Sequence, residues 1–539
     1  MEAVVDQLDG LTIRSSLKGD RDWYIVAHGK QSKVFRLSPH GPGESEDICT
    51  LVWEDDKIAQ CYPSHSGHQL CIYRTGSTTV DIVDVLTRSV RISVPLASGS
   101  TLSSALFSPK DNYLMLHTTH SETNPNNLVI YKLSGDATTA VFSIPYTKSY
   151  IVKRYPLWTP CEKYCIMRVN NDVLVWTENN FSHEAVSKIT LVEGAEGSPL
   201  FPTSSIVSVS PVNKEELCYI GIFLPNQKKF DNGVVKIYSA KNLDAPLVEH
   251  LFACTEEGEF FWNHNGTSLM LRTFTNNVKG LSSYYGGNGL HLINPGKGRV
   301  KTIMEPTEGL AHDISWSKSS NELLIVRGSM PAELAMYDGA NGNKLLSFGR
   351  SNRNTIRRDP FDRFILVAGF GNSSGDIDIW DLRSRKKIAQ TKSDCSVICE
   401  FSPDGRFFVT ATTVPRMRVN NCFKVFSYGG KLVHQVDFEE LYHVSLISLG
   451  MTFAQRDPSP GACTIQPTVT KSLYRPPGSR GTDAGMTYTR VALQNLEAVP
   501  VAKKPVPVLK GPPGADLTLL NAAARIGRKK KAKAKLPVK

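Results

Sequence analysis

The chain has 539 residues, 41% hydrophobic and 21% charged, which is the composition of a globular protein. Its first residues lack the basic start and apolar core of a signal peptide, and no run of 18 apolar residues occurs, so we expect neither a signal peptide nor a membrane span. The net charge of +11 is uneven. Residues 456–539 hold 16 Lys and Arg against 4 Asp and Glu, a balance of +12 that leaves −1 for residues 1–455.

Along the first 450 residues one short motif recurs: an apolar run, a turn rich in Ser, Pro, Asp and Gly, and a second apolar run. The clearest copy is CEFSPDGRFFVTA, whose turn runs from Ser402 to Gly405. Apolar runs of four to eight residues on either side of such a turn predict paired β-strands. Seven further copies, spaced 42–54 residues apart, centre on Pro63, Pro109, Pro160, Pro211, His264, Lys318 and Pro360.

A second element, a short strand with an apolar centre and a polar turn, recurs with the same period. The first copy pairs with the early stretch DWYIVAHG, and the eighth contains Trp380-Asp381, a dipeptide common in propeller repeats. Its nine copies begin at Ser32, Thr78, Asn127, Asp172, Val234, Leu290, Glu333, Asp376 and Cys422.

Four short strands per period indicate propeller blades, because stacking the blades in a ring buries both faces of each sheet. We therefore predict an all-β fold, a nine-bladed WD40-like β-propeller over residues 1–450, with a disordered basic tail. The stretch Tyr442–Leu449 could supply the strand that closes the ring. Two or three separate sandwich domains are the alternative, which the lack of linker-like breaks disfavours.

Motifs for catalysis and cofactors are weak. Gly371 to Gly375 match the pattern G-x-S-x-G around Ser373, but a nucleophile elbow leads into a helix, whereas a strand, DIDIW, follows here. We predict a loop there, and another at SYYGGNGL (283–290). No phosphate-binding P-loop is present, and the 11 scattered cysteines are expected to fill cores, with Cys161/Cys165 and Cys395/Cys399 spaced one residue wider than C-x-x-C. We expect no enzyme activity, no cofactor and no metal.

Basic residues gather in two predicted loops, RSNRNTIRRD between adjacent blades and PRMRVNN within the last blade. Loops on a rigid scaffold are where binding residues concentrate, although ordinary solvated charge is the alternative. The candidate binding residues are Arg350, Arg353, Arg357, Arg358, Arg416 and Arg418.

The C-terminal region is predicted to be a disordered Pro/Gly-rich linker over residues 451–516 and a basic tail over 517–539, with a possible short helix from Leu517 to Arg525. A basic cluster in the tail has three interpretations: contact with an RNA backbone, a nuclear-localisation signal, or a solvated charge run. The cluster consists of Arg528, Lys529, Lys530, Lys531, Lys533 and Lys535.

Several stretches together resemble the eukaryotic translation initiation factor 2A family: GLAHDISWS, LVAGFGNSSGDIDIWDL, FSPDGRFFVTAT, PRMRVNN and LYRPPGSRG. The resemblance runs in order from about residue 200 to 480. It implies a nine-bladed propeller with a flexible C-terminal region, in which tRNA and mRNA binding lies mainly in that region. The tail here lacks the long charged helical extension usual in the family.

The resemblance further implies a non-catalytic, cytoplasmic factor that delivers initiator methionyl-tRNA to the small (40S) ribosomal subunit for selected mRNAs, without GTP. Its expected partners are the small ribosomal subunit, initiator tRNA and mRNA through the tail, and other initiation factors, with the chain itself a monomer. The loop arginines would then face the ribosome. A pure scaffold, like the propeller subunit of the large initiation factor 3 complex, is the alternative.

Overall fold

The computed structural model describes residues 22–38, 48–146, 156–169, 172–182, 186–190, 206–225, 232–275, 286–414 and 416–453. The predicted linker from residue 454 onward and the basic tail over 517–539 lie outside the described residues. Their disorder and the short helix therefore stay predictions.

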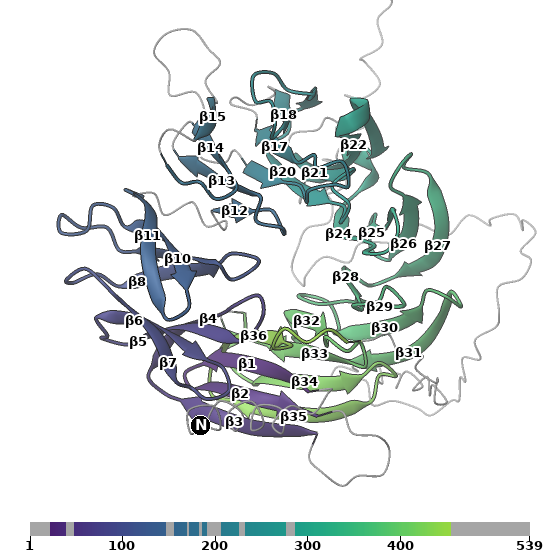
Figure 1. Cartoon of the computed structure of the whole chain (residues 1–539). Helices are drawn as coiled ribbons and strands as arrows, with labels where there is room; N and C mark the ends of the chain where they lie inside the picture. Colours follow the sequence, from purple (N-terminus) through teal and green to yellow (C-terminus); the bar gives the residue numbers. More distant parts are fainter. Residues whose placement is uncertain are drawn as a thin grey trace, which may run out of the picture. The chain divides into compact units, whose positions relative to one another are not determined.

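The described chain forms nine antiparallel four-stranded sheets arranged in a ring, so the predicted nine-bladed propeller is confirmed (Figure 1). We number the sheets as blades 1 to 9 and give the strands of each from the innermost to the outermost. Blade 1 is β36 (Leu441–Ile447), β1 (Trp23–Gly29), β2 (Ser32–Leu37) and β3 (Cys49–Asp55). Blade 2 is β4 (Ile58–Pro63), β5 (Gln69–Arg74), β6 (Thr79–Asp84) and β7 (Val90–Pro95). Blade 3 is β8 (Leu102–Phe107), β9 (Tyr113–Thr118), β10 (Leu128–Ser134) and β11 (Ala137–Ile144).

The next three blades repeat this order. Blade 4 is β12 (Leu157–Trp158), β13 (Tyr164–Val169), β14 (Asp172–Thr177) and β15 (Ser187–Thr190). Blade 5 is β16 (Ile206–Val209), β17 (Tyr219–Leu224), β18 (Asn232–Ser239) and β19 (Val248–Ala253). Blade 6 is β20 (Glu257–Trp262), β21 (Leu269–Thr275), β22 (Gly287–Asn294) and β23 (Arg299–Met304), with two 3₁₀ turns at η2 (Pro295–Lys297) and η3 (Pro306–Glu308).

The last three blades carry the candidate site. Blade 7 is β24 (Ala311–Trp316), β25 (Glu322–Arg327), β26 (Ala332–Asp338) and β27 (Lys344–Ser351). Blade 8 is β28 (Thr355–Arg358), β29 (Phe364–Ala368), β30 (Asp376–Asp381) and β31 (Lys386–Lys392). Blade 9 is β32 (Ile398–Phe401), β33 (Phe407–Thr412), β34 (Asn421–Ser427) and β35 (Leu432–Phe438).

The ring is closed by the strand that the sequence predicted. β36, from the C-terminal end of the propeller, pairs antiparallel with β1, with Val444 opposite Ala27 and Ile447 opposite Tyr24. Val444 packs in a cluster with blade 9, and Ile447 packs in another with blade 2. One strand thereby joins the two ends of the repeat array, which removes the exposed end blades that an open array would have.

Burial explains the pattern of apolar and polar residues in the strands of each blade. The second strand lies between the neighbouring blades, so both its faces are buried: every residue of β17 and of β29 is buried. Such strands read as continuous apolar runs, and burying a Leu or Ile side chain stabilises the fold by about 1.5–3 kcal/mol. The fourth strand lies at the rim, where β27 has no buried residue and alternates between partly and fully exposed positions.

The recurrent turn motif joins the first and second strands, and its residue choices follow from its geometry. The side chain of its first residue accepts a hydrogen bond from the backbone N–H five residues later. Ser402 Oγ, for example, accepts the N–H of Phe407 at 3.0 Å. The same bond recurs from Tyr113 N to Ser108 Oγ at 2.9 Å. The fourth residue adopts a positive φ, 68° at Gly405, which favours glycine there.

In several blades the fourth turn residue is instead a carboxylate, and it accepts hydrogen bonds from the preceding blade. Asp111 accepts the N–H groups of His65 at 2.8 Å and Ser66 at 2.9 Å. Glu162 accepts the N–H of Lys110 at 2.6 Å. These inter-blade contacts add directional bonds to the apolar packing between blades.

Antiparallel pairing gives the ring two ends. We call the end with the turns between first and second and between third and fourth strands the turn face. The opposite end, with the second-to-third loops and the links between blades, is the return face. After β36 the described chain stays at the turn face, where Gly450 donates its N–H to Ser66 O in the turn of blade 2.

The loop predictions were partly right. Residues 369–375, with the G-x-S-x-G pattern, form a loop between β29 and β30, as predicted. The loop predicted over 283–290 is wrong from Gly287 onward, because Gly287–Leu290 begin β22 and are buried. Glycine is required in this strand at Gly289, where a Cβ would lie 2.6 Å from both His291 Nε2 and Thr273 Oγ1. The preceding tyrosines lie outside the described residues.

The cysteines of the described ranges form no disulfide, and the core-filling prediction holds for only some of them. Cys165 and Cys399 are buried, and burial raises the pKa of the Cys399 thiol to about 12. Cys161 and Cys395 are exposed instead, because each lies in a surface turn. Within the described ranges, no helix is long and apolar enough to cross a membrane.

Candidate interaction surface

Three of the predicted arginines lie on the return face of blades 7 to 9. Arg350 is exposed near the end of β27, and Arg418 is exposed in the loop between β33 and β34. Arg416, in the same loop, donates a hydrogen bond to Asn372 Oδ1 at 2.7 Å. Acidic residues surround them at this end of the same blades: Asp376, Asp394, Glu439 and Glu440.

The prediction of an exposed loop cation is wrong for Arg353. Its side chain is 8% exposed, with Nε 3.0 Å from Asp378 Oδ2 and Nη1 3.6 Å from Asp376 Oδ2. Both carboxylates lie on β30 of blade 8, so Arg353 anchors the link from blade 7 to that blade. A buried arginine of this kind cannot contact a partner, and loss of its carboxylates would leave an uncompensated buried charge.

Arg357 and Arg358 are also not loop residues, because both end the innermost strand β28. The Arg357 side chain links the inner strands of three blades. It donates hydrogen bonds to Asp313 Oδ2 of blade 7 at 3.1 Å and to Cys399 O of blade 9 at 3.0 Å. Arg358 is 5% exposed and pairs with Asp362 at 3.3 Å. Of the four arginines predicted between blades, Arg350 is therefore exposed, Arg357 has a side chain that is 41% exposed but bonded to two neighbouring blades, and Arg353 and Arg358 have buried side chains.

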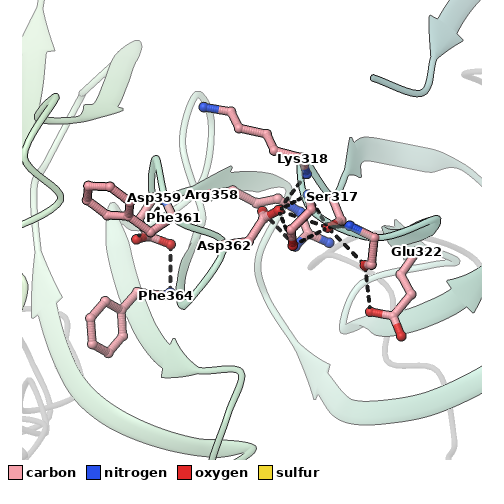
Figure 2. A network of polar contacts seen from close by, with 10 residues as sticks. Ser317, Lys318, Glu322, Arg358, Asp359, Phe361, Asp362 and Phe364 are labelled. Atoms are coloured by element: carbon pink, nitrogen blue, oxygen red, sulfur yellow. Dashed lines mark hydrogen bonds and ion pairs between the residues drawn. The ribbon is translucent and has the colours of Figure 1, made fainter. Parts of the chain in front are cut away.

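Asp362 is the centre of a polar network between blades 7 and 8, shown in Figure 2. Besides Arg358, its Oδ2 accepts hydrogen bonds from Ser317 Oγ at 2.8 Å, Lys318 N at 2.5 Å and Ser319 N at 2.8 Å. Burial acts to raise the pKa of Asp362, but these hydrogen bonds and the charge of Arg358 outweigh it, so the pKa lies below its ordinary value. Asp362 is thus a charged carboxylate fully occupied within the protein.

Burial lowers the pKa of Arg358, opposed by the charge of Asp362 and the hydrogen bond to it. Two of its N–H groups, at Nε and Nη2, have no acceptor among the described residues. Asp362 is therefore the partner that makes the buried guanidinium tolerable.

A small pocket of about 150 Å³ opens beside this network and joins two turns of the turn face. One wall is the turn between β24 and β25, and the other is the hairpin between β30 and β31. Polar and apolar side chains line it: Ser317, Ser319, Ser320, Glu322, Met336, Leu346, Arg358, Asp362, Leu382 and Arg385. The pocket places Arg385 of blade 8 next to the serine-rich turn of blade 7.

Around this pocket the turn face carries cations that form no ion pair with a described residue. All are exposed except Arg406, which is half-buried. In Figure 2 the Lys318 side chain extends away from Asp362. We call the set the turn-face cations: Lys318 of blade 7, Arg385 and Lys386 of blade 8, and Arg406 and Lys431 of blade 9.

The carboxylates of the same turns accept hydrogen bonds inside the turns. Asp381 accepts the N–H of Arg383, and Asp338 accepts that of Ala340. Asp404 accepts the N–H of Arg406 at 3.1 Å, and Glu322 accepts the hydroxyl of Ser320. The five turn-face cations therefore project without an ion-pair partner among the described residues, although the surrounding turns contain several acids and Arg363 of the same face is paired with Asp381.

Packing between blades makes the surface continuous. The turn of blade 9 lies against that of blade 8, since a Cβ at Gly405 would be 3.1 Å from the Phe361 ring. Phe364 of blade 8 stacks on Tyr428 of blade 9 with ring centroids 5.3 Å apart. Sequence reasoning missed this surface, although the basic run RSRKK at 383–387 in a hairpin was a signal for part of it.

The comparisons with known proteins agree with one another. A family model described as "Eukaryotic translation initiation factor eIF2A" matches residues 250–444. The chain is 32% identical over 351 residues to the eukaryotic translation initiation factor 2A of Schizosaccharomyces pombe, covering 62% of this chain and 58% of that relative. It is 28% identical over 412 residues to that of Dictyostelium discoideum, covering 76% and 62%. The chain thus spans 58–62% of the length of these two relatives.

A solved structure described as "Crystal structure of the eukaryotic initiation factor" is similar to this chain with a TM-score of 0.63 at 26% identity. The match covers 79% of this chain and 98% of that one. The similarity therefore extends over the ring as a whole, beyond the part that the family model matches.

Proposed function

We propose that this chain, which is similar to eukaryotic translation initiation factor 2A proteins, belongs to that family and promotes GTP-independent, codon-dependent delivery of initiator methionyl-tRNA to the small ribosomal subunit for selected mRNAs. The family is one of translation initiation factors. The role is non-catalytic and cytoplasmic. The ring docks on the small subunit, the tail contacts RNA, and other initiation factors are further partners.

The observation that carries this proposal is the family match over residues 250–444. That stretch contains all of blades 7 and 8 and blade 9, which hold the turn-face cations. The matched part is thus the part with surface charge suited to a polyanion such as ribosomal RNA.

The charge of the chain supports a division of labour. Residues 456–539 carry a balance of +12 and residues 1–455 carry −1. The cluster from Arg528 to Lys535 is therefore the proposed contact for tRNA and mRNA, through phosphates and the release of counterions. Monomeric action is sufficient for such a factor, because one chain has both parts.

The first test is filter binding of initiator tRNA by the full chain and by a chain without residues 517–539. The truncation removes eight Lys and Arg residues. We therefore expect weaker binding and a flatter dependence on salt, by up to about 6 in the log–log slope. Equal affinity with the same salt slope would rule out the tail as the RNA contact.

The second candidate function is a scaffold that binds the ribosome and protein partners without touching tRNA. It is favoured by the ring itself, whose loops offer binding surfaces on a rigid frame. Sucrose-gradient co-migration with the small subunit, combined with the tRNA measurement, separates the two functions. A scaffold co-migrates but binds no initiator tRNA, whereas the delivery factor does both, and a chain that does neither fits neither proposal.

A further inference from the structure

We propose that the turn face of blades 7 to 9 is a docking surface for the phosphate backbone of structured RNA. The proposal rests on the proposed function and deepens it, since it names which end of the ring meets RNA. The surface is made by the turn-face cations, which sit on the turns of three successive blades.

The charge of the turn-face cations is available to a partner. None of the five cations is in an ion pair with a described residue, and the acids of the same turns accept hydrogen bonds within them. A phosphate therefore meets these side chains without first displacing an internal partner. On the return face of the same blades, the exposed carboxylate of Glu440 repels a polyanion.

Contacts between the blades join the turn-face cations into one surface. The pocket beside Asp362 is lined by both Ser319 and Arg385, so the turn of blade 7 and the hairpin of blade 8 are neighbours. The ring contact between Phe364 and Tyr428 holds blade 9 beside them. Cations on three adjacent blades can therefore contact several phosphates of one backbone at the same time.

The side chains of this surface are of the types that bind phosphate. Cores of protein–protein interfaces are depleted in Lys, whereas phosphate oxygens are bound by Lys, Arg and Ser side chains. Lys318, Lys386 and Lys431 are three of the five cations here, and exposed Ser319 lies beside them. An RNA backbone therefore fits this surface better than an acidic protein does.

The experiment compares two charge reversals in the full chain. K318E/R385E/K386E changes the turn face, and R350E/R416E/R418E changes the return face by the same amount of charge. Binding of a short stem–loop RNA is followed by fluorescence anisotropy over a series of salt concentrations, with circular dichroism to check folding. The neutral variant K318Q/R385Q/K386Q removes the same three positive charges from the turn face without introducing negative ones.

We expect the turn-face reversal to weaken binding about tenfold to a hundredfold at physiological ionic strength and to lower the salt slope by about 2 to 3. The neutral variant lowers the slope in the same direction. The return-face reversal leaves affinity within about twofold. Equal losses in both reversals, or no loss in the turn-face variants, would overturn the proposal.

Co-sedimentation of each variant with the small ribosomal subunit distinguishes an incorrect docking surface from an incorrect proposed function. If the unaltered chain does not co-sediment, the proposed function fails. If it does, and the turn-face reversal changes neither RNA binding nor co-sedimentation, only the docking surface fails. If the reversal abolishes co-sedimentation but leaves the affinity for RNA unchanged, the surface binds an acidic protein, and the RNA proposal is wrong.

Discussion

The two ends of blades 7 to 9 are built from the same strands, yet they treat charge in opposite ways. At the turn face the carboxylates accept hydrogen bonds within and between turns, and the cations project. At the return face Arg353 is buried against Asp378, and the carboxylate of Glu440 is exposed. The difference lies in how the charges are paired, so counting charged residues along the sequence does not reveal it.

Each end also holds one buried arginine, and the two differ in their partners. Arg353 has two carboxylates, those of Asp376 and Asp378. Arg358 is in an ion pair with Asp362, which is also the centre of the inter-blade network. The turn face should therefore be more sensitive to loss of one carboxylate than the return face.

The largest expected effect comes from Asp362→Ala. It leaves Arg358 buried without its ion-pair partner and removes the acceptor for the turn of blade 7, so the free energy of unfolding should fall by about 3–5 kcal/mol. The matched change Asp378→Ala should cost about 1–3 kcal/mol, since Asp376 still faces Arg353. Urea unfolding followed by fluorescence measures both. A larger loss for Asp378→Ala would reverse the comparison.

One glycine on each face allows the backbone of the two faces to be compared. Gly405 on the turn face and Gly371 on the return face both have positive φ, 68° and 73°. Alanine at either position costs about 1–2 kcal/mol in strain. At position 405 the added Cβ also lies 3.1 Å from the Phe361 ring, whereas at 371 the nearest atom is 3.7 Å away. Thermal unfolding should show that Gly405→Ala lowers the stability of the protein more than Gly371→Ala does. Equal losses of stability would mean that the Phe361 ring moves aside without cost.

The turn-face network should also depend on pH. The pKa of Asp362 is depressed in the folded protein, so its contribution is fully present above the ordinary pKa of 3.8 and is lost as the pH falls through the depressed value. The difference in unfolding free energy between the unaltered chain and Asp362→Asn should therefore shrink on acidification below that range. A difference that stays constant with pH would show that the charge of Asp362 does not stabilise the fold.

The smallest effects are expected from single surface cations. Lys318→Ala and Arg418→Ala should each change the free energy of unfolding by less than about 0.5 kcal/mol, because both side chains are exposed and unpaired among the described residues. Urea unfolding of the two variants checks this. A loss above 1 kcal/mol for Lys318→Ala would mean that the side chain has a structural role and would weaken its use as a probe of binding.

The ring was predictable from sequence because its signals are local. The turn motif recurs with a narrow period, and the first position of each turn must supply a side-chain acceptor, as Ser402 and Ser108 do. The closing strand could also be predicted from sequence. Tyr442–Leu449 has the apolar pattern of a strand and remains after the strands of the other blades have been assigned. Each of these signals lies within one short stretch of the chain, although β36 itself pairs with the distant β1.

The surface was not predictable, because it depends on residues far apart in the chain. Arg353 and Arg350 are three residues apart and look alike in the sequence, yet only ring geometry brings Asp376 and Asp378 onto Arg353. Likewise Lys318 and Arg385 become neighbours only when blade 7 meets blade 8. The predicted loop arginines therefore included two buried residues and missed the turn-face cations.

Site-specific crosslinking tests the central claim most directly. A photoreactive phenylalanine analogue placed at position 386 or 431 on the turn face, and at 350 or 418 on the return face, would be activated in complexes of the full chain with the small ribosomal subunit. The account predicts crosslinks to ribosomal RNA from positions 386 and 431 and none from 350 and 418. Crosslinks to RNA from the return-face positions alone would contradict it.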